Sequence, residues 1–449
     1  MSFHAIVIGA NADALVAAQL LARAGRQVLV IEETATAAHD RAGWVPAQLV
    51  EQLGLQLKVE LPDPWATVLL PDGGTLELWC DMARSVESIR KLSPNDAARW
   101  PDFCRRIGAL ARLFERLYLE APADPRNAKL ALRVRRLGRQ GMEDLMRILP
   151  MSVAELLDDW FECDALKGAL GALGVLHLQQ GPRSGGTAFR LVHHHVGSAD
   201  GVFRPARSDL VSVLRQGTGV QIRTARAQKI VLKGARVAGI ALESGEQILA
   251  PLVVSGTDPR RTLLELADPG WFDPELGRAV ANIRRRGVAA RVSFKASIAG
   301  NVVWAPSLDY LERAYDHVKY GRVSREPYLE ACSSADGVDV HFQYVPYETT
   351  EAPTEHLADT ARRLLPALQH APATVLAPAD LERQEGWPGG QAYHAELALD
   401  QALWMRPLPQ LAQYATPIEG LWLCGPGTHP GGGIAGASGY NCVRAILNT

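Results

Sequence analysis

The pattern of apolar and polar positions at the start of the chain predicts a strand–helix–strand unit. Residues 3–8 are an apolar run of β type, residues 12–24 carry a helical pattern, and residues 27–31 form a second apolar run. Gly25 stands where the helix is expected to end, because glycine suits the backbone conformation that follows a helix. Two apolar strands joined by a helix are typical of the βαβ unit that binds dinucleotides.

A second strand-and-helix pattern lies at the far end of the chain. Residues 421–424 indicate a short buried strand, and residues 434–447 carry a helical pattern rich in small side chains. The glycines at 431–433 leave backbone N–H groups unshielded near a helix N-terminus, where the helix dipole favours a phosphate or another polar group. The alternative is a plain turn with glycines for steric reasons. Pairing with the N-terminal unit favours the nucleotide interpretation.

The middle of the chain alternates between helical and β patterns. Helical spacing dominates from residue 82 to about 168. The predicted strands are 75–79, 220–224, 227–232, 237–242, 247–254, 289–296 and 338–345. A chain of 449 residues exceeds the usual size of one domain. We therefore expect a nucleotide-binding domain built from residues 1–75, 196–258 and 379–449, and a substrate domain built from residues 76–195 and 259–378.

Composition and charge restrict the class of function. The formal net charge is −2, so electrostatics favours neither nucleic acid nor an acidic surface as the partner. The six cysteines are scattered without metal-ligand spacing, which is typical of reduced thiols in a cytosolic protein. The first residues do not resemble a cleavable leader, and no apolar run approaches the length of a membrane span. We expect a cytoplasmic protein, with peripheral membrane contact left open.

The turn after the first strand matches the dinucleotide fingerprint in part. The pattern G-x-G-x-x-G becomes Gly9, Asn11 and Ala14 in this sequence. Alanine is accepted at the third position, but the middle glycine normally lets the backbone approach the pyrophosphate, and Asn11 places a side chain there. Glu32 ends the second strand about 20 residues after the first glycine, where an acid bonds the ribose hydroxyls. Any βαβ unit is the alternative; the placement of Glu32 favours the nucleotide.

Several stretches along nearly the whole chain occur in the order found in one family. They are Leu92-Ser93-Pro94 with Asp96-Ala97, Gly181-Pro182 with Gly186-Thr187-Ala188, Val253-Val254-Ser255 with Asp258-Pro259, Gly389-Gly390 with His394, Leu399-Asp400-Gln401 with Arg406-Pro407, and the run 427–433. On these residues the sequence resembles the phytoene desaturase-like FAD-dependent oxidoreductases, in the phytoene dehydrogenase-related or pyridine nucleotide-disulfide oxidoreductase domain-containing branch. The C-terminal glycine run is the most specific of them.

The resemblance implies an α/β fold, with a Rossmann-like FAD-binding domain of the amine oxidase and phytoene desaturase type and an interleaved α+β substrate domain. It implies non-covalent FAD, whose adenosine half lies on residues 9–14 and Glu32 and whose flavin half lies near residues 431–434. The expected cofactor-binding residues are Gly9, Asn11, Ala14, Glu32, Ala227, Gly425, Gly431, Gly432, Gly433 and Ile434. In related flavoproteins the residue that matches Ala227 contacts adenine through its backbone.

Histidines supply the candidates for a catalytic role. Flavin chemistry needs few acid–base groups, because the cofactor carries the hydride step. His394 lies in a segment that the family places near the flavin ring, and His429 lies in the glycine run; a hydrogen-bonded structural histidine is the alternative for each. The adjacent histidines 193–195 do not share one face of a helix or strand, so we expect no metal site there.

Two glycine sites of the family are replaced in this sequence. The family carries a double glycine after the second strand, and Trp44, within Asp40-Arg41-Ala42-Gly43-Trp44, takes its second position, where the indole would line or plug the site. Further along the chain, Pro205-Ala206-Arg207-Ser208-Asp209 replaces a glycine pair of the family. The first function hypothesis is an FAD-dependent oxidoreductase that removes hydride from an apolar, isoprenoid-like or amine-type substrate. The second is a non-catalytic relative whose eroded FAD site leaves a binding or assembly role. An NAD(P)-only reductase would leave the C-terminal glycine run without a role.

Residues 126–139 are strongly basic and partly amphipathic. The cations are Arg126, Lys129, Arg133, Arg135, Arg136 and Arg139, and leucines and valines are interleaved with them. Such a helix suits the surface of an anionic membrane or an acidic protein partner. A solvated helix face is the alternative. The expected partners are therefore a small-molecule substrate and, through this segment, a membrane or a protein.

Overall fold

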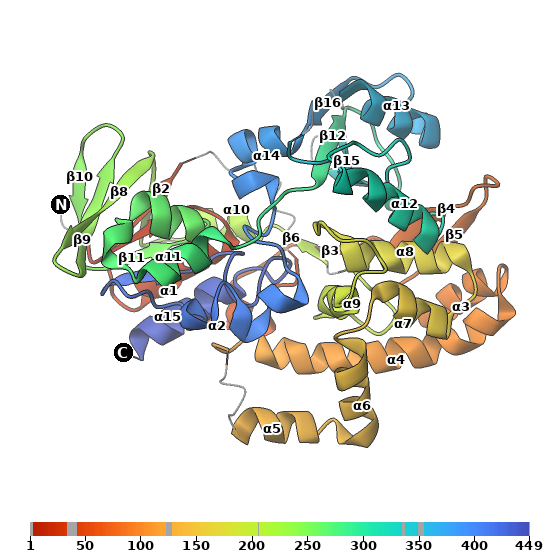
Figure 1. Cartoon of the computed structure of the whole chain (residues 1–449), viewed down its shortest axis with the longest axis horizontal. Helices are drawn as coiled ribbons and strands as arrows, with labels where there is room; N and C mark the ends of the chain where they lie inside the picture. Colours follow the sequence, from red (N-terminus) through yellow and green to blue (C-terminus); the bar gives the residue numbers. More distant parts are fainter. Residues whose placement is uncertain are drawn as a thin grey trace.

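The computed structural model describes residues 3–33, 43–122, 128–204, 206–334, 337–348 and 354–448. Of the stretches discussed above, Asp40, Arg41, Ala42, Arg126 and Pro205 lie outside these residues, as does the side chain of Lys129. Figure 1 shows one group of strands near the two termini, a second group around β12 and β15, and a layer of helices below the second group.

Five parallel strands form the first sheet, which combines three separated segments of the chain. Their order is β17 (Leu421–Leu423), β11 (Val253–Ser255), β1 (Ala5–Ile8), β2 (Val28–Glu32) and β7 (Val220–Thr224). Helices α1 (Ala12–Arg23), α10 (Leu210–Arg215) and α15 (Ala437–Leu447) pack on one face. Both faces are covered, which explains the uninterrupted apolar sequence of the central strands.

A small antiparallel sheet covers the other face of the parallel sheet. Its order is β10 (Gln247–Leu249), β9 (Arg236–Leu242) and β8 (Ala227–Lys233), and α11 (Pro274–Ala281) packs beside it. The predicted strand 247–254 is two strands, since β10 ends at Leu249 and β11 begins at Val253 in the other sheet. Pro251 lies between them, and proline cannot donate a ladder hydrogen bond.

A seven-stranded sheet forms the second region. Its order is β16 (Ala373–Leu376), β12 (Ala289–Phe294), β15 (Gly337–Gln343), β14 (Leu329–Ser334), β13 (Asn301–Trp304), β4 (Ala66–Leu69) and β5 (Thr75–Leu78). β4 pairs in parallel with β13, so residues 66–75 belong to this sheet and not with the nucleotide unit. The predicted boundary at residue 75 is wrong, because the pairing partner of β4 lies more than two hundred residues further along the chain.

The two faces of the seven-stranded sheet differ in chemistry. One face carries Val292, Val340 and Phe342, which pack with α13 (Thr354–Leu364) in a buried apolar cluster. The alternate positions, Arg291 and His341 among them, point to the opposite side and line a cavity. Successive side chains of a strand point to opposite faces, so neighbouring residues serve different purposes here.

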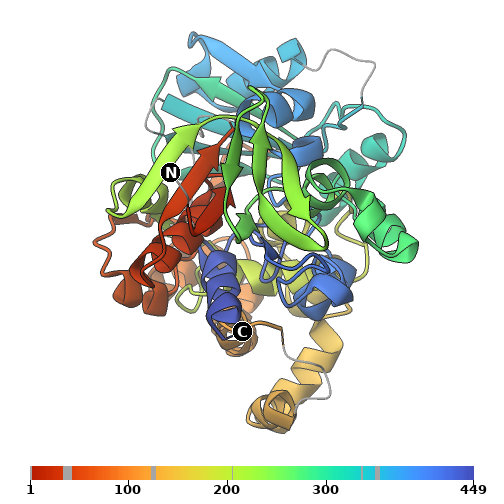
Figure 2. The same ribbon diagram turned by 90° about the vertical axis from the view of Figure 1, so that its left-hand side faces the viewer.

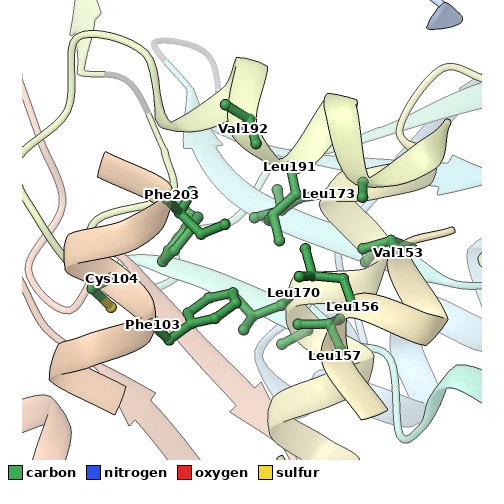
Figure 3. Close-up of a cluster of buried hydrophobic side chains, with 14 of the residues drawn as sticks. Phe103, Cys104, Val153, Leu156, Leu157, Leu170, Leu173, Leu191, Val192 and Phe203 are labelled. Carbon is green, nitrogen blue, oxygen red and sulfur yellow. The ribbon is translucent and has the colours of Figure 1, made fainter. Parts of the chain in front are cut away.

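The helices between β5 and α10 form the layer below this sheet. They are α3 (Met82–Arg90), α4 (Pro94–Leu117), α5 (Ala128–Arg135), α6 (Gly138–Ile148), α7 (Val153–Trp160), α8 (Asp164–Val175) and α9 (Thr187–His195). Figure 3 shows side chains from four of these helices meeting in one apolar core, with Phe103 of α4 near Leu157 of α7, Leu170 of α8 and Leu191 of α9. The remaining elements are α2 (Ala47–Leu53), α12 (Leu308–Lys319), α14 (Pro378–Glu385) and the strand pair β3 (Val59–Glu60) and β6 (Arg207–Ser208).

The predicted basic helix 126–139 is interrupted. α5 ends at Arg135, and α6 begins at Gly138, whose φ of 71° is a left-handed conformation that favours glycine. Figures 1 and 2 show α5 projecting away from the rest of the molecule. Within the residues that the structure describes, no helix has the length and apolar character needed to cross a membrane.

Candidate functional site

One cavity connects the two regions of the molecule. It has a volume of about 440 Å³. The nucleotide side contributes residues 9–13, Glu33, Gly43, residues 256–258, Arg261, Pro426 and residues 432–435; the other side contributes His177, His194, Arg204, Arg207, Arg291, Asn301, Glu330, Cys332, Asp339, His341, Glu385 and residues 392–394, among others. The residues expected to bind a cofactor and a polar sheet face therefore share one space.

Asn11 has a structural role at the start of α1. Its side-chain oxygen accepts the N–H of Ala14 at 3.0 Å, and its amide nitrogen donates to the carbonyl of Gly256 at 2.7 Å. The φ of Asn11 is −71°, so the position does not need a glycine backbone. The Asn11 side chain therefore caps the helix and ties the turn to β11, and its expected obstruction of the pyrophosphate stays a prediction. Ala14 does not line the cavity but packs against Gly256.

The acid that faces the cavity is Glu33 and not Glu32. Glu32 is buried, and both of its carboxylate oxygens are bonded to Arg215 of α10. Glu33 pairs with Arg261 and accepts the backbone N–H of Ala227 at 3.1 Å. The two residues predicted to meet the adenosine, Glu32 and Ala227, thus have protein partners in this structure.

Only some residues of the C-terminal glycine run line the cavity; the others shape the turn that carries them. Gly432, Gly433 and Ile434 line the cavity, and Gly433 has a φ of 89°. Gly425 and Gly431 also have positive φ but do not line the cavity. A Cβ on Gly425 would lie 2.6 Å from the carbonyl oxygen of Gly256, so this glycine allows β11 and the turn after β17 to approach closely.

Trp44 neither lines nor plugs the cavity. Its backbone forms a bridge with Ile434: its N–H donates to Gly433 at 3.0 Å, and its carbonyl accepts the N–H of Ala435 at 2.8 Å. Its indole packs toward Gly197, where a Cβ would lie 2.1 Å from the ring. The expectation that Trp44 occupies the site is therefore wrong, because the ring turns away into the helical layer.

The structure separates the two candidate histidines. His394 lines the cavity, and burial, followed by the charges of Arg406 and Arg285, lowers its pKa to about 3. His429 does not line the cavity; its Nε2 lies 3.2 Å from the carbonyl of Leu117, and burial lowers its pKa to about 4. The geometry therefore leaves His394 as a candidate for substrate contact and gives His429 a structural hydrogen bond.

The three adjacent histidines of α9 point in different directions. His193 bonds the carbonyl of Gly432 through Nε2 at 2.9 Å, which leaves Nδ1 to accept from Tyr118 at 2.8 Å. His194 lines the cavity, and His195 bonds Val202. Among the described residues no group of three histidine, cysteine or acidic side chains is placed to hold a metal ion. His193, which does not line the cavity, therefore holds the glycine run in place through its hydrogen bond to Gly432.

The polar floor of the cavity is the functional feature that the sequence analysis missed. We use this name for the cavity-facing side chains of β12 to β15: Arg291, Asn301, Glu330, Cys332, Asp339 and His341. Arg291, His341 and Glu330 are register partners in one row across three strands, and Asp339, Cys332 and Asn301 form the next row. Polar residues at every second position of the predicted strands were the available signal.

Charge pairs hold this floor together. Arg204 forms a buried ion pair with Glu330, which also accepts the hydroxyl of Tyr328 at 2.7 Å. Burial raises the pKa of the Glu330 carboxyl, but Arg204 and Tyr328 outweigh burial and hold that pKa below its usual value. Arg291 pairs with Glu385 at 2.6 Å. The charged side chains of the floor are therefore held in place by ion pairs and hydrogen bonds.

Comparison with known proteins gives relatives across the whole chain. No protein-family model matches. The chain is 26% identical to pyridine nucleotide-disulfide oxidoreductase domain-containing protein 2 of Rattus norvegicus, over 99% of this chain and 93% of that protein. It is 26% identical to hydroxyneurosporene desaturase of Rubrivivax gelatinosus, over 98% and 93%. A redesigned putrescine oxidase matches the structure with a TM-score of 0.61 at 13% identity, over 100% of this chain and 99% of that one.

These likenesses define the class of the fold. The predicted resemblance to phytoene desaturase-like oxidoreductases is confirmed, and so is the α/β fold of the amine oxidase and phytoene desaturase type. FAD as the predicted cofactor agrees with these relatives. The relatives carry oxidoreductase names, whereas the choice of substrate differs among them.

Proposed function

We propose that this protein is an FAD-dependent oxidoreductase that removes a hydride from a small organic substrate. One observation carries the proposal: a single cavity extends from the N-terminus of α1, past the glycines 432 and 433, to the polar floor. Hydride transfer requires the donor and the acceptor to meet in one space from which water is excluded. Similarity to a desaturase and to an amine oxidase supports the same class.

The residues around the cavity fit FAD. The backbone N–H groups at the start of α1 suit a pyrophosphate, because a helix N-terminus attracts anions. Gly433 lines the cavity with a left-handed φ of 89°, a conformation that favours glycine, and an added Cβ would lie 3.4 Å from Nε2 of His193. Bound FAD would accept the hydride, and the chain would hold the substrate and exclude water. Glu32 would reach the ribose only by exchanging its partner Arg215.

His394 is proposed to bind substrate as a neutral group. Its pKa of about 3 leaves it uncharged near neutral pH and makes it a poor proton acceptor there. Within the described residues its Nδ1 has no hydrogen-bond partner although the atom is buried. A buried polar atom without a partner is costly, so a substrate group that hydrogen-bonds Nδ1 is favoured.

The second candidate function is a non-catalytic relative with a binding or assembly role. Two observations favour it: Glu32 is bonded to Arg215, and Arg207 stands where the family has a glycine pair. The polar floor argues against it. Burying an ion pair such as Arg204–Glu330 costs desolvation energy that an apolar pair would avoid. A fold kept only for assembly has no use for such a floor inside a cavity.

Titration of the protein with FAD, followed by flavin fluorescence, tests the proposed function. Gly433→Leu places a side chain beside the cavity and is expected to weaken FAD binding by about tenfold or more. Gly245→Leu is the matched control, because Gly245 also has a left-handed φ, of 85°, but has nothing within 4 Å of its Cβ. Equal FAD affinity of both variants and the wild type would contradict the proposed site.

We also propose a cytoplasmic protein whose projecting helix α5 contacts an anionic surface. The six cysteines are scattered along the sequence without metal-ligand spacing, in keeping with reduced thiols in a cytosolic protein. Arg135 and Arg136 are exposed, and Leu132 beside them is 51% exposed. Arg133 is instead engaged with Glu120 through two hydrogen bonds. An anionic membrane is the partner that this combination of cations and an exposed leucine favours.

Sedimentation with liposomes tests this surface. Binding is expected to rise with anionic lipid and to fall with salt, and Arg135→Glu/Arg136→Glu is expected to abolish it. Arg223→Glu is the control, since Arg223 lies in β7, away from α5. Absence of binding at every lipid composition would remove the membrane from the proposed partners and leave the small-molecule substrate.

A further inference from the structure

The arginines of the cavity differ in their partners. Arg204 pairs with Glu330, and Arg291 pairs with Glu385. Arg207 contacts only neutral acceptors: its Nη1 donates to the carbonyl of Ser333 at 2.9 Å, and its Nη2 donates to the side-chain oxygen of Asn301 at 2.7 Å. Among the described residues no carboxylate forms an ion pair with Arg207, although Glu60 of β3 is its register partner.

The neutral contacts hold the Arg207 guanidinium in one orientation. Asn301 is itself fixed, because its amide nitrogen donates to the carbonyl of Trp65 at 3.1 Å. β6, which carries Arg207, is paired with β3 and cannot move freely. A guanidinium that is fixed by neutral groups keeps further N–H donors for a ligand. Its planar fork matches the two oxygens of a carboxylate.

An apolar substrate fits this space poorly. An isoprenoid chain would cover the Arg207 guanidinium and keep its remaining N–H donors from water without accepting a hydrogen bond from them, which is costly. A ligand with a carboxylate pairs with Arg207 and leaves polar groups of the floor to bond the rest of the molecule. The carboxylate is therefore the feature that the cavity selects.

We propose that the substrate is a small polar molecule with a carboxylate, and that Arg207 binds this carboxylate. This inference rests on the proposed function, in which the same cavity also holds FAD. It separates the protein from relatives whose names refer to apolar substrates, and it gives Arg207 a role at a position where the family has glycine. The fork lies over β13 and β14, on the sheet side of the cavity.

Thermal-shift titration with a series of monocarboxylates, from propanoate to 3-phenylpropanoate, and with the matched amides tests the inference. At least one carboxylate is expected to raise the melting temperature in a saturable manner, and its amide is expected to bind about tenfold more weakly or worse. Arg207→Gln is expected to lose this binding, and Arg207→Lys is expected to recover only part of it, because lysine keeps the charge but not the fork. Arg236→Gln, at an exposed ion pair on β9, is the control.

The same samples distinguish this inference from the proposed function. FAD affinity is measured separately on each variant, and Arg207→Gln is expected to change it by less than about twofold. If Arg207→Gln loses FAD instead of the carboxylate, or if carboxylate and amide bind alike, the inference is overturned. If the wild type binds a carboxylate through Arg207 but takes up no FAD, the proposed function fails and the carboxylate site stands.

Discussion

The two faces of the seven-stranded sheet are made by the same strands and differ in almost every respect. On one face Val292, Val340 and Phe342 pack with α13 and are fully buried. On the other, Arg291, Glu330 and His341 form a cross-strand row beside the cavity. The difference shows that adjacent residues of one strand have different roles. The side chains of the apolar face stabilise the fold, whereas the buried charges of the polar floor cost desolvation energy and form a binding site.

The largest expected effect is a loss of stability in mild acid. Burial lowers the pKa of six histidines, His177, His193, His194, His195, His394 and His429. Below about pH 6.5 the unfolded chain binds protons that the folded chain excludes, so each histidine lowers the free energy of unfolding by about 1.4 kcal/mol per pH unit. This stability is fully present above pH 6.5 and is lost as the pH falls toward the folded pKa values.

Urea unfolding at pH 7.5, 6.5 and 5.5 measures this effect. The midpoint is expected to be somewhat lower at pH 6.5 than at pH 7.5, because histidines of the unfolded chain are half protonated there, and much lower at pH 5.5. His429→Gln, which keeps a polar side chain near Leu117, is expected to flatten the decline. Equal midpoints at pH 7.5 and 5.5 would show that the fold does not hold these six histidines neutral.

The apolar face is tested by Phe342→Ala. Phe342 is completely buried, so its truncation is expected to lower the free energy of unfolding by about 3–5 kcal/mol. Its neighbour on the polar floor gives the comparison: His341→Ala is expected to cost less than about 1.5 kcal/mol. Denaturant unfolding of both variants measures the two costs, and similar costs would remove the proposed division between the faces.

The buried ion pair of the floor is tested by Glu330→Gln. This change leaves Arg204 buried without its carboxylate and is expected to cost about 3–5 kcal/mol. Arg204→Met/Glu330→Leu removes both charges and is expected to cost much less, or to stabilise the protein. A double variant that is less stable than the single one would mean that the pair itself carries the stability.

A smaller effect is expected at the turn before α1. Asn11→Ala removes the helix cap and the hydrogen bond to Gly256, with an expected cost of about 1 kcal/mol. Asn11→Asp keeps the cap but places a carboxylate next to the Gly256 carbonyl and the proposed pyrophosphate, so FAD binding is expected to weaken more than stability does. Thermal unfolding and FAD titration separate the two results. Tighter FAD binding in Asn11→Ala would support the view that the side chain obstructs the cofactor.

The sequence predicted the elements whose signal is local. The apolar runs at 3–8, 27–31 and 421–424 became β1, β2 and β17 because strands covered on both faces are apolar throughout. Pairing between distant segments left no such signal: residues 66–69 were not predicted as a strand and were placed in the nucleotide-binding domain, whereas they form β4 of the seven-stranded sheet. The choice between Glu32 and Glu33 also depended on partners far along the chain, Arg215 and Arg261. The polar residues of β12 and β15 alternate within the predicted strands, whereas β13 and β14 were not predicted, and only the structure brings the rows together.

The absorption spectrum of the purified protein after incubation with FAD and gel filtration is the most direct test of the central claim that the cavity holds a flavin. The account predicts a yellow protein with flavin bands, and a Gly433→Leu variant that loses them while Gly245→Leu keeps them. A wild-type protein that folds but stays colourless after incubation with excess FAD would contradict it.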